Sequence, residues 1–165
     1  MKFLTALMLF GLCCLLGGSE WVGSYREAQQ RALRENKKIL IFFSGSDWCE
    51  PGRVLERDLF RTEAFQRLAS EKYVLYNADF PKYTKLGYGL EERNRRLASR
   101  YGISRFPAVV VVEPKYGSLL VKQVGMSGGM TPKKLLEKLS KIEKATARSG
   151  QVRKPGPAPA GKASE

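Results

Sequence analysis

Cys49 is the residue of this 165-residue sequence whose type and surroundings point to nucleophilic chemistry. Glu50 and Pro51 follow it, and a proline suits the first turn of a helix because no N–H is needed there. A thiol at a helix start faces unpaired backbone N–H groups and the positive end of the helix dipole, which favour the nucleophilic thiolate. Arg53 adds positive charge, whereas Asp47 and Glu50 oppose it. These acidic and proline neighbours predict that Cys49 is accessible.

The absence of histidine and the small number of cysteines exclude several kinds of catalytic and metal site. The sequence contains no histidine, which excludes Ser–His and Cys–His nucleophilic pairs and histidine metal sites. Its three cysteines are too few for a zinc site of four thiolates from one chain. Two of them, Cys13 and Cys14, belong to an N-terminal apolar run. We therefore expect no metal and no cofactor, with Cys49 as the sole nucleophile.

The N-terminal segment has the layout of a secretory signal peptide. Lys2 precedes a nearly unbroken apolar run over residues 3–16, and three small residues complete a predicted signal peptide of residues 1–19. The run is shorter than the ~20 residues that span a bilayer. Two alternatives stay open: a retained membrane anchor, and a lipoprotein modified at Cys13. In each case the protein is expected to be exported, periplasmic or extracellular. If residues 1–19 are removed, two of the three cysteines leave with them.

The pattern of apolar residues after the signal peptide predicts alternating helices and strands. Helices are expected at 25–36, 54–68, 90–101 and from 132 onward, and strands at 39–43, 73–79, 107–112 and 118–124. Strands separated by helices are expected to pair in parallel, and the last two to form a hairpin. The fold class is therefore α/β with a mixed sheet. Residues 20–148 are expected to form one domain, and residues 149–165, rich in proline, alanine and glycine, a disordered basic tail.

The first predicted helix carries the clearest local signals. Ser24 and Glu27 have the spacing of a capping box, in which each side chain bonds a backbone N–H at the start of the helix. Ala28, Ala32 and Leu33 are expected on the inner face of that helix, together with Tyr25.

Two segments resemble the thioredoxin-like superfamily. Residues 42–53, FFSGSDWCEPGR, look like the thioredoxin active-site segment, in which W-C-x-x-C follows a core strand. Residues 101–112, YGISRFPAVVVV, look like the segment that carries the cis-proline of that family. The Ser-Asp-Trp-Cys form is similar to secreted bacterial thioredoxin-like proteins. The resemblance covers residues 21–146 and implies a thioredoxin fold, with a mixed central β-sheet flanked by helices on both faces.

The resemblance also implies roles for individual residues. Cys49 matches the nucleophilic cysteine, and Trp48 the aromatic residue beside it. Pro107 matches the cis-proline, whose loop in the family packs against the reactive sulfur and offers backbone hydrogen bonds to the substrate chain. Phe106 and Pro51 would complete the substrate-binding surface. Core packing alone is an equally good account of Trp48 and Phe106, and a trans proline at the start of a strand is the alternative for Pro107.

Two departures from the family pattern shape the functional expectation. Gly52 occupies the position of the resolving cysteine, so a mixed disulfide on Cys49 could be released only by an external thiol or by shuffling within the substrate. Phe43 replaces the buried aspartate of many thioredoxins, which leaves Asp47, Glu50 or water as proton acceptor. We expect monothiol or isomerase-like thiol–disulfide exchange. The alternative is a binding module that keeps the fold and has lost redox activity.

The net charge of +13 indicates anionic partners or a strongly solvated surface. Arg93, Arg96 and Arg100 share one helical face, and several lysines lie along the last predicted helix. We expect mostly solvated faces with weak contact to anionic surfaces, and an electrostatic adaptor is a third hypothesis. No nucleic-acid motif accompanies the charge, so nucleic acid is not an expected partner. The expected partners are cysteine-containing proteins or small thiols in the cell envelope.

Overall fold

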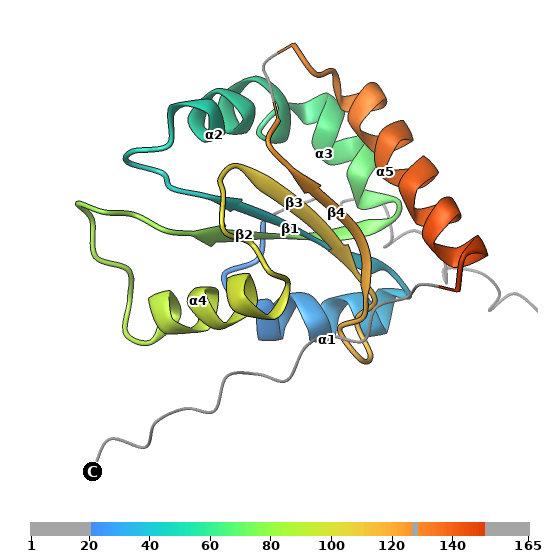
Figure 1. Ribbon diagram of the computed structural model, residues 1–165, viewed down its shortest axis with the longest axis horizontal. Helices are drawn as coiled ribbons and strands as arrows, with labels where there is room; N and C mark the ends of the chain where they lie inside the picture. The colour runs from blue at the N-terminus through green and yellow to red at the C-terminus, as the bar shows by residue number, and fades with distance from the viewer. Residues whose placement is uncertain (1–20, 127–128, 151–165) are drawn as a thin grey trace, which may run out of the picture.

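A four-stranded sheet of order β2-β1-β3-β4 lies between two layers of helices in the computed structural model (Figure 1). The structure describes residues 21–126 and 129–150, so the predicted signal peptide and most of the predicted tail lie outside the described residues. The strands are β1 (Lys38–Ser44), β2 (Tyr73–Asp79), β3 (Ala108–Val112) and β4 (Leu119–Val124). The helices are α1 (Tyr25–Glu35), α2 (Glu50–Leu55), the π-helical turn η1 (Glu56–Phe60), α3 (Glu63–Ser70), α4 (Leu90–Arg100) and α5 (Pro132–Arg148).

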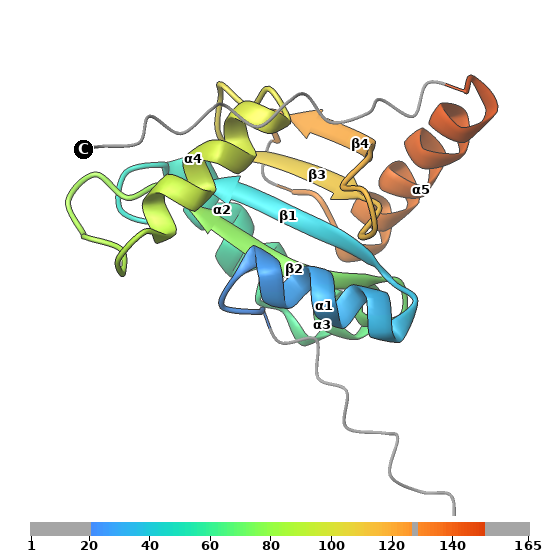
Figure 2. The ribbon, with the colours of Figure 1, turned by 90° about the horizontal axis from the view of Figure 1, so that it is seen from below.

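The helices cover both faces of the sheet, as predicted. Helices α1 and α4 lie on one face, and α2, α3 and α5 on the other (Figures 1 and 2). Successive residues of a strand point to opposite faces, so Ile41 and Phe43 contact the α1/α4 layer while Leu40 and Phe42 contact the α3/α5 layer. The central strands β1 and β3 are therefore buried on both faces, which explains why they are continuous apolar runs in the sequence.

The pairing of β3 corrects the expectation of parallel strands. Strands β1 and β2 pair in parallel and β3 and β4 form the predicted antiparallel hairpin, but β1 and β3 are antiparallel. An intervening helix gives parallel pairing only if it carries the chain back to the edge where the first strand began. Here Ala108, the first residue of β3, pairs with Phe43 near the end of β1. This arrangement brings the start of β3 to the end of the sheet where β1 finishes and the segment with Cys49 begins.

Two helix predictions also change in detail. Ala28 and Ala32 are fully buried on α1, but Leu33 is 51% exposed, because one residue further on turns the side chain by ~100°. The predicted helix 54–68 is divided among α2, η1 and α3, where the Thr62 hydroxyl accepts the N–H of Phe65 and starts a new helix. The Ser24 cap is confirmed by its bond from the Glu27 N–H. Among the described residues, no helix has the length and apolarity to cross a membrane.

Candidate active site

Cys49 lies at the junction between β1 and α2, in a turn closed by its own backbone. The Cys49 N–H donates to the Gly45 carbonyl at 2.8 Å, and the Cys49 carbonyl accepts the N–H of Arg53 at 3.0 Å. Cys49 is thus the N-cap residue of α2, and its side chain makes no capping hydrogen bond. The turn is held by these backbone hydrogen bonds, and the Cys49 thiol does not cap α2.

The burial of Cys49 corrects the expectation that it is accessible. The residue is only 4% exposed, whereas Glu50 and Pro51 beside it are exposed. The physical reason is the change from strand to helix, where neighbouring side chains point in different directions. The exposure of Glu50 and Pro51 therefore does not predict the exposure of Cys49. Any reaction at this sulfur would therefore require a partner that approaches it closely.

Gly52 and Ser44 share the space beside the sulfur. A Cβ atom added to Gly52 would lie 3.2 Å from Cys49 Sγ and would overlap Ser44 Oγ. Position 52, which the resemblance assigns to a second cysteine, therefore faces the sulfur, and the Ser44 hydroxyl occupies the space that a side chain there would fill. Ser44 is 3% exposed. No local sequence signal marks this serine, because only the contact of β1 with α2 makes it part of the site.

Trp48 is fixed by polar and aromatic contacts. Its indole N–H donates to the Phe80 carbonyl at 2.6 Å, and its ring lies edge-on to Phe106 with centroids 5.8 Å apart. Phe80 also contacts Phe106 at 4.9 Å. A Cβ on Gly45 would overlap the indole nitrogen, so the indole can lie there only over a glycine. Phe80, which the sequence analysis missed, joins the site because β2 ends at the same edge as β1.

Pro107 and Pro51 lie on two different elements of this edge. The Phe106–Pro107 peptide bond is cis, in agreement with the resemblance. Pro107 is buried and directly precedes β3, whose first residue Ala108 pairs with Phe43 at the end of β1. Pro51 is exposed in the first turn of α2. The antiparallel pairing of β1 and β3 thus brings the two family motifs to one edge.

The carboxylates near Cys49 are occupied by other groups. Asp47 accepts the backbone N–H groups of residues 82, 83 and 84 at 2.9, 2.7 and 2.9 Å. Desolvation raises the pKa of Asp47, but these N–H donors outweigh it and hold the pKa below its ordinary value. Glu50 pairs with Arg53. We therefore expect water, rather than either carboxylate, to take the proton from the thiol.

Acid should release residues 82–84 from Asp47. Because the folded-state pKa of Asp47 is lowered, its hydrogen bonds stabilise the loop above the ordinary pKa of ~3.9 and are lost as the pH falls through the lower folded-state value. Asp47→Ala should reproduce this loss at neutral pH as faster hydrogen exchange of these three amides. Glu50→Ala, which removes a neighbouring carboxylate that contacts no loop amide, is the control. Unchanged exchange in Asp47→Ala would contradict the assignment.

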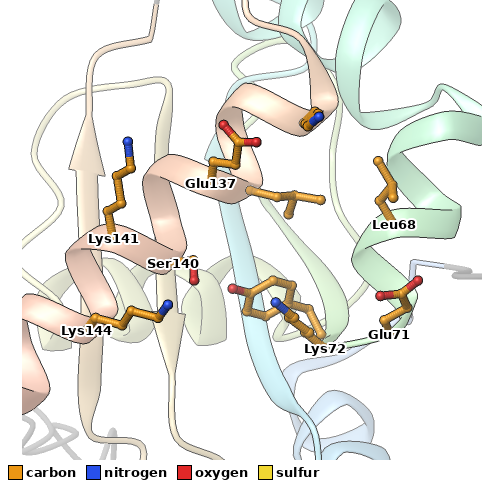
Figure 3. Close-up of a pocket in the computed structure, with 10 residues that line it drawn as sticks. Leu68, Glu71, Lys72, Glu137, Ser140, Lys141 and Lys144 are labelled. Atoms are coloured by element: carbon orange, nitrogen blue, oxygen red, sulfur yellow. The ribbon is translucent and has the colours of Figure 1, made fainter.

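The basic residues gather in two grooves, neither of which is lined by a residue of the Cys49 turn. A groove of about 330 Å³ between α3 and α5 is lined by Lys72, Lys133, Lys141 and Lys144, with Glu71 and Glu137 (Figure 3). A groove of about 500 Å³ between α1 and α4 is lined by Arg26, Arg93, Arg96 and Arg100. Within residues 21–126 and 129–150, no three Cys, Asp or Glu side chains gather as a metal site would require.

Two curated proteins are similar to this chain in sequence. The disulfide bond reductase DsbH of Chlamydia pneumoniae is 26% identical over 106 residues, which cover 64% of this chain and 63% of that protein. The thioredoxin-related protein DsbJ of the same organism is 23% identical over 122 residues, 74% of this chain and 34% of that protein. The chain thus spans less than two thirds of the length of each of these curated relatives.

Solved structures agree with the fold. A structure described as DsbH oxidoreductase superposes with a TM-score of 0.67 at 25% identity, covering 76% of this chain and 84% of that one. A disulphide isomerase from Xylella fastidiosa Temecula1 has a TM-score of 0.53 at 24% identity, covering 71% and 86%. The family model described as thioredoxin-like matches residues 20–114, a segment that includes Cys49 and the cis bond before Pro107. This chain belongs to the thioredoxin-like family.

Proposed function

We propose that this protein is an exported thiol–disulfide exchange protein that acts through Cys49 alone. The observation that carries the proposal is the site itself: Cys49 is the N-cap residue of α2, and the ring of Trp48 next to it contacts Phe106, which lies directly before Pro107 and β3. The similarity to DsbH, which is described as a disulfide bond reductase, supports the same chemistry. The signal peptide of residues 1–19 would deliver the domain of residues 20–148 to the cell envelope, where its partners are cysteine-containing proteins or small thiols.

The proposed reaction begins with attack of the Cys49 thiolate on one sulfur of a substrate disulfide. A Cys49–substrate disulfide forms, the substrate S–S bond breaks, and the second substrate sulfur leaves as a thiolate that water protonates. Trp48 and Phe106 would contact the substrate chain beside the sulfur, as would Pro51 and Pro107. The 4% exposure of Cys49 means that the partner has to be held against this surface before exchange.

Release from Cys49 then follows one of two routes. A low-molecular-weight thiolate, or another thiolate of the substrate, attacks the substrate sulfur of the mixed disulfide; in both routes a new disulfide forms on that sulfur and Cys49 leaves as thiolate. The second route shuffles substrate disulfides without net oxidation or reduction. Gly52 carries no side chain, so no second sulfur of α2 competes with these routes.

A redox-inactive binding module is the second candidate function. The burial of Cys49 and the glycine at position 52 favour it, because both slow turnover. In that case the aromatic surface around Trp48 would hold partners without covalent exchange. The two candidates differ in one property: whether complexes with partners depend on the sulfur atom of Cys49.

Disulfide reshuffling with a Cys49→Ser variant separates the two functions. We expect the protein to accelerate recovery of an enzyme with scrambled disulfides in buffer with reduced glutathione, and Cys49→Ser to match buffer alone. Cys13 and Cys14 are replaced by serine in both proteins, so that only one thiol is tested. No acceleration by the protein, and no mixed disulfide detectable by mass, would overturn the exchange function. Partner complexes that survive Cys49→Ser would then establish the binding module.

A further inference from the structure

The end of β2 and the loop that follows it are hydrogen-bonded to residues 46–48, just before Cys49. Ser46 donates from its N–H and its hydroxyl to the Asp79 carboxylate at 2.8 and 2.7 Å. Asp47 accepts three N–H groups of residues 82–84, and Trp48 donates to the Phe80 carbonyl. The β1–α2 and β2–α4 loops accordingly lie side by side at the same end of the sheet (Figure 1). These bonds make residues 80–84 part of the surface that surrounds Cys49.

The side chains on this fastened loop are cationic and aromatic. Lys82 Nζ lies 4.4 Å from the centre of the Trp48 ring, a distance at which cation and ring attract each other. Tyr83 is 82% exposed beside it. Arg105 is also exposed and directly precedes Phe106, the other ring in contact with Trp48. Lys82 therefore lies over one ring of this aromatic pair, and Arg105 directly precedes the other ring in the chain.

The carboxylates around the sulfur do not neutralise these cations by direct pairing. Asp79 is bonded to Ser46 and Asp47 to the loop backbone, while Glu50 pairs with Arg53. In the part of the chain that the structure describes, no carboxylate lies within salt-bridge distance of Lys82 or Arg105. Asp47 and Asp79 keep their charges, but their oxygens are engaged within the two loops, which leaves Lys82 and Arg105 to meet a partner's carboxylates on a chain whose net charge is +13.

We propose that Lys82 and Arg105 select partner segments in which acidic residues flank the cysteine to be exchanged. The inference rests on the proposed exchange function and adds its substrate class. An extended peptide whose cysteine reaches Cys49 would pass over Trp48 and Phe106. Carboxylates two or three residues from its cysteine would then meet Lys82 on one side and Arg105 on the other. A basic peptide would face like charges at both places.

The test uses short peptides whose single cysteine carries a chromogenic aromatic thiol as a mixed disulfide. Four residues around the cysteine are all Glu, all Gln or all Lys. Attack of Cys49 on the peptide sulfur releases the aromatic thiolate, whose absorbance gives the rate. At low salt we expect the Glu peptide to react about 3- to 10-fold faster than the Lys peptide, with Gln between them, and the difference to shrink at about 0.5 M salt.

Charge reversal on the protein locates the effect. Lys82→Glu and Arg105→Glu should each reduce or invert the preference, whereas Lys144→Glu, the same charge change in the α3/α5 groove, should leave it unchanged (Figure 3). Equal rates for the three peptides, or a preference that Lys82→Glu and Arg105→Glu do not alter, would overturn the inference and leave the exchange function intact. If none of the three peptides reacts with Cys49, both proposals fail.

Discussion

Replacing Gly52 by cysteine should convert the single-thiol site into a dithiol site. The Cβ introduced by Gly52→Cys would lie 3.2 Å from Cys49 Sγ, from which the new sulfur can reach the ~2.0 Å of a disulfide bond. In a mixed disulfide the new thiolate would attack the Cys49 sulfur, form an internal disulfide with it and release the substrate as a thiolate. Effective molarities of well-oriented groups exceed ~10⁵ M, so at millimolar external thiol we expect the lifetime of the mixed disulfide to fall at least about 100-fold.

The contact of position 52 with Ser44 provides the controls for this prediction. A Cβ at position 52 would overlap Ser44 Oγ, so the hydroxyl has to turn away in Gly52→Cys. Adding Ser44→Ala should therefore accelerate release further, while Gly52→Ser, which adds the same Cβ without sulfur, should not shorten the lifetime. The mixed disulfide is followed by mass spectrometry after mixing with a disulfide-linked peptide. A long-lived mixed disulfide both in Gly52→Cys and in its combination with Ser44→Ala would contradict the proposed position of residue 52.

Phe42→Ala should produce the largest loss of stability. Phe42 is fully buried on the central strand β1, with its ring 4.5 Å from that of Phe60 and 6.4 Å from that of Trp21. Removing a buried phenyl ring from such a cluster leaves a cavity and costs about 3–5 kcal/mol in the free energy of unfolding. That loss is a large part of the total stability of a small domain. Urea unfolding followed by circular dichroism measures it through the shift of the midpoint.

A matched apolar-to-alanine change on the surface is the control for Phe42→Ala. Leu33 is 51% exposed on α1, so Leu33→Ala should change the free energy of unfolding by less than about 0.5 kcal/mol. The reverse order, with Leu33→Ala the more costly change, would show that the apolar face of α1 includes Leu33 after all. Similar midpoints for Phe42→Ala and the unsubstituted protein would contradict the assigned core.

The sequence was sufficient to predict the four strands, three of the helices and the two motifs, whereas the predicted helix 54–68 is divided in the structure. Hydrophobic runs such as the one in β3 and caps such as Ser24 are local signals, because they depend on side-chain periodicity and on hydrogen bonds within a few residues. The thioredoxin-like family was visible for the same reason, since its two motifs are short contiguous segments. The cysteine at the strand-to-helix junction and the glycine at position 52 could therefore be identified without coordinates.

The surroundings of the sulfur follow from contacts between segments that are far apart in the sequence. The exposure of Cys49, the use of Asp47 as an anchor for residues 82–84, and the Ser44 hydroxyl beside Gly52 all depend on contacts between separate segments. The antiparallel pairing of β1 and β3 is of the same kind, because it depends on which edge of the sheet the chain reaches after α4. Contacts between distant segments are set by how whole elements pack, and local periodicity does not record them.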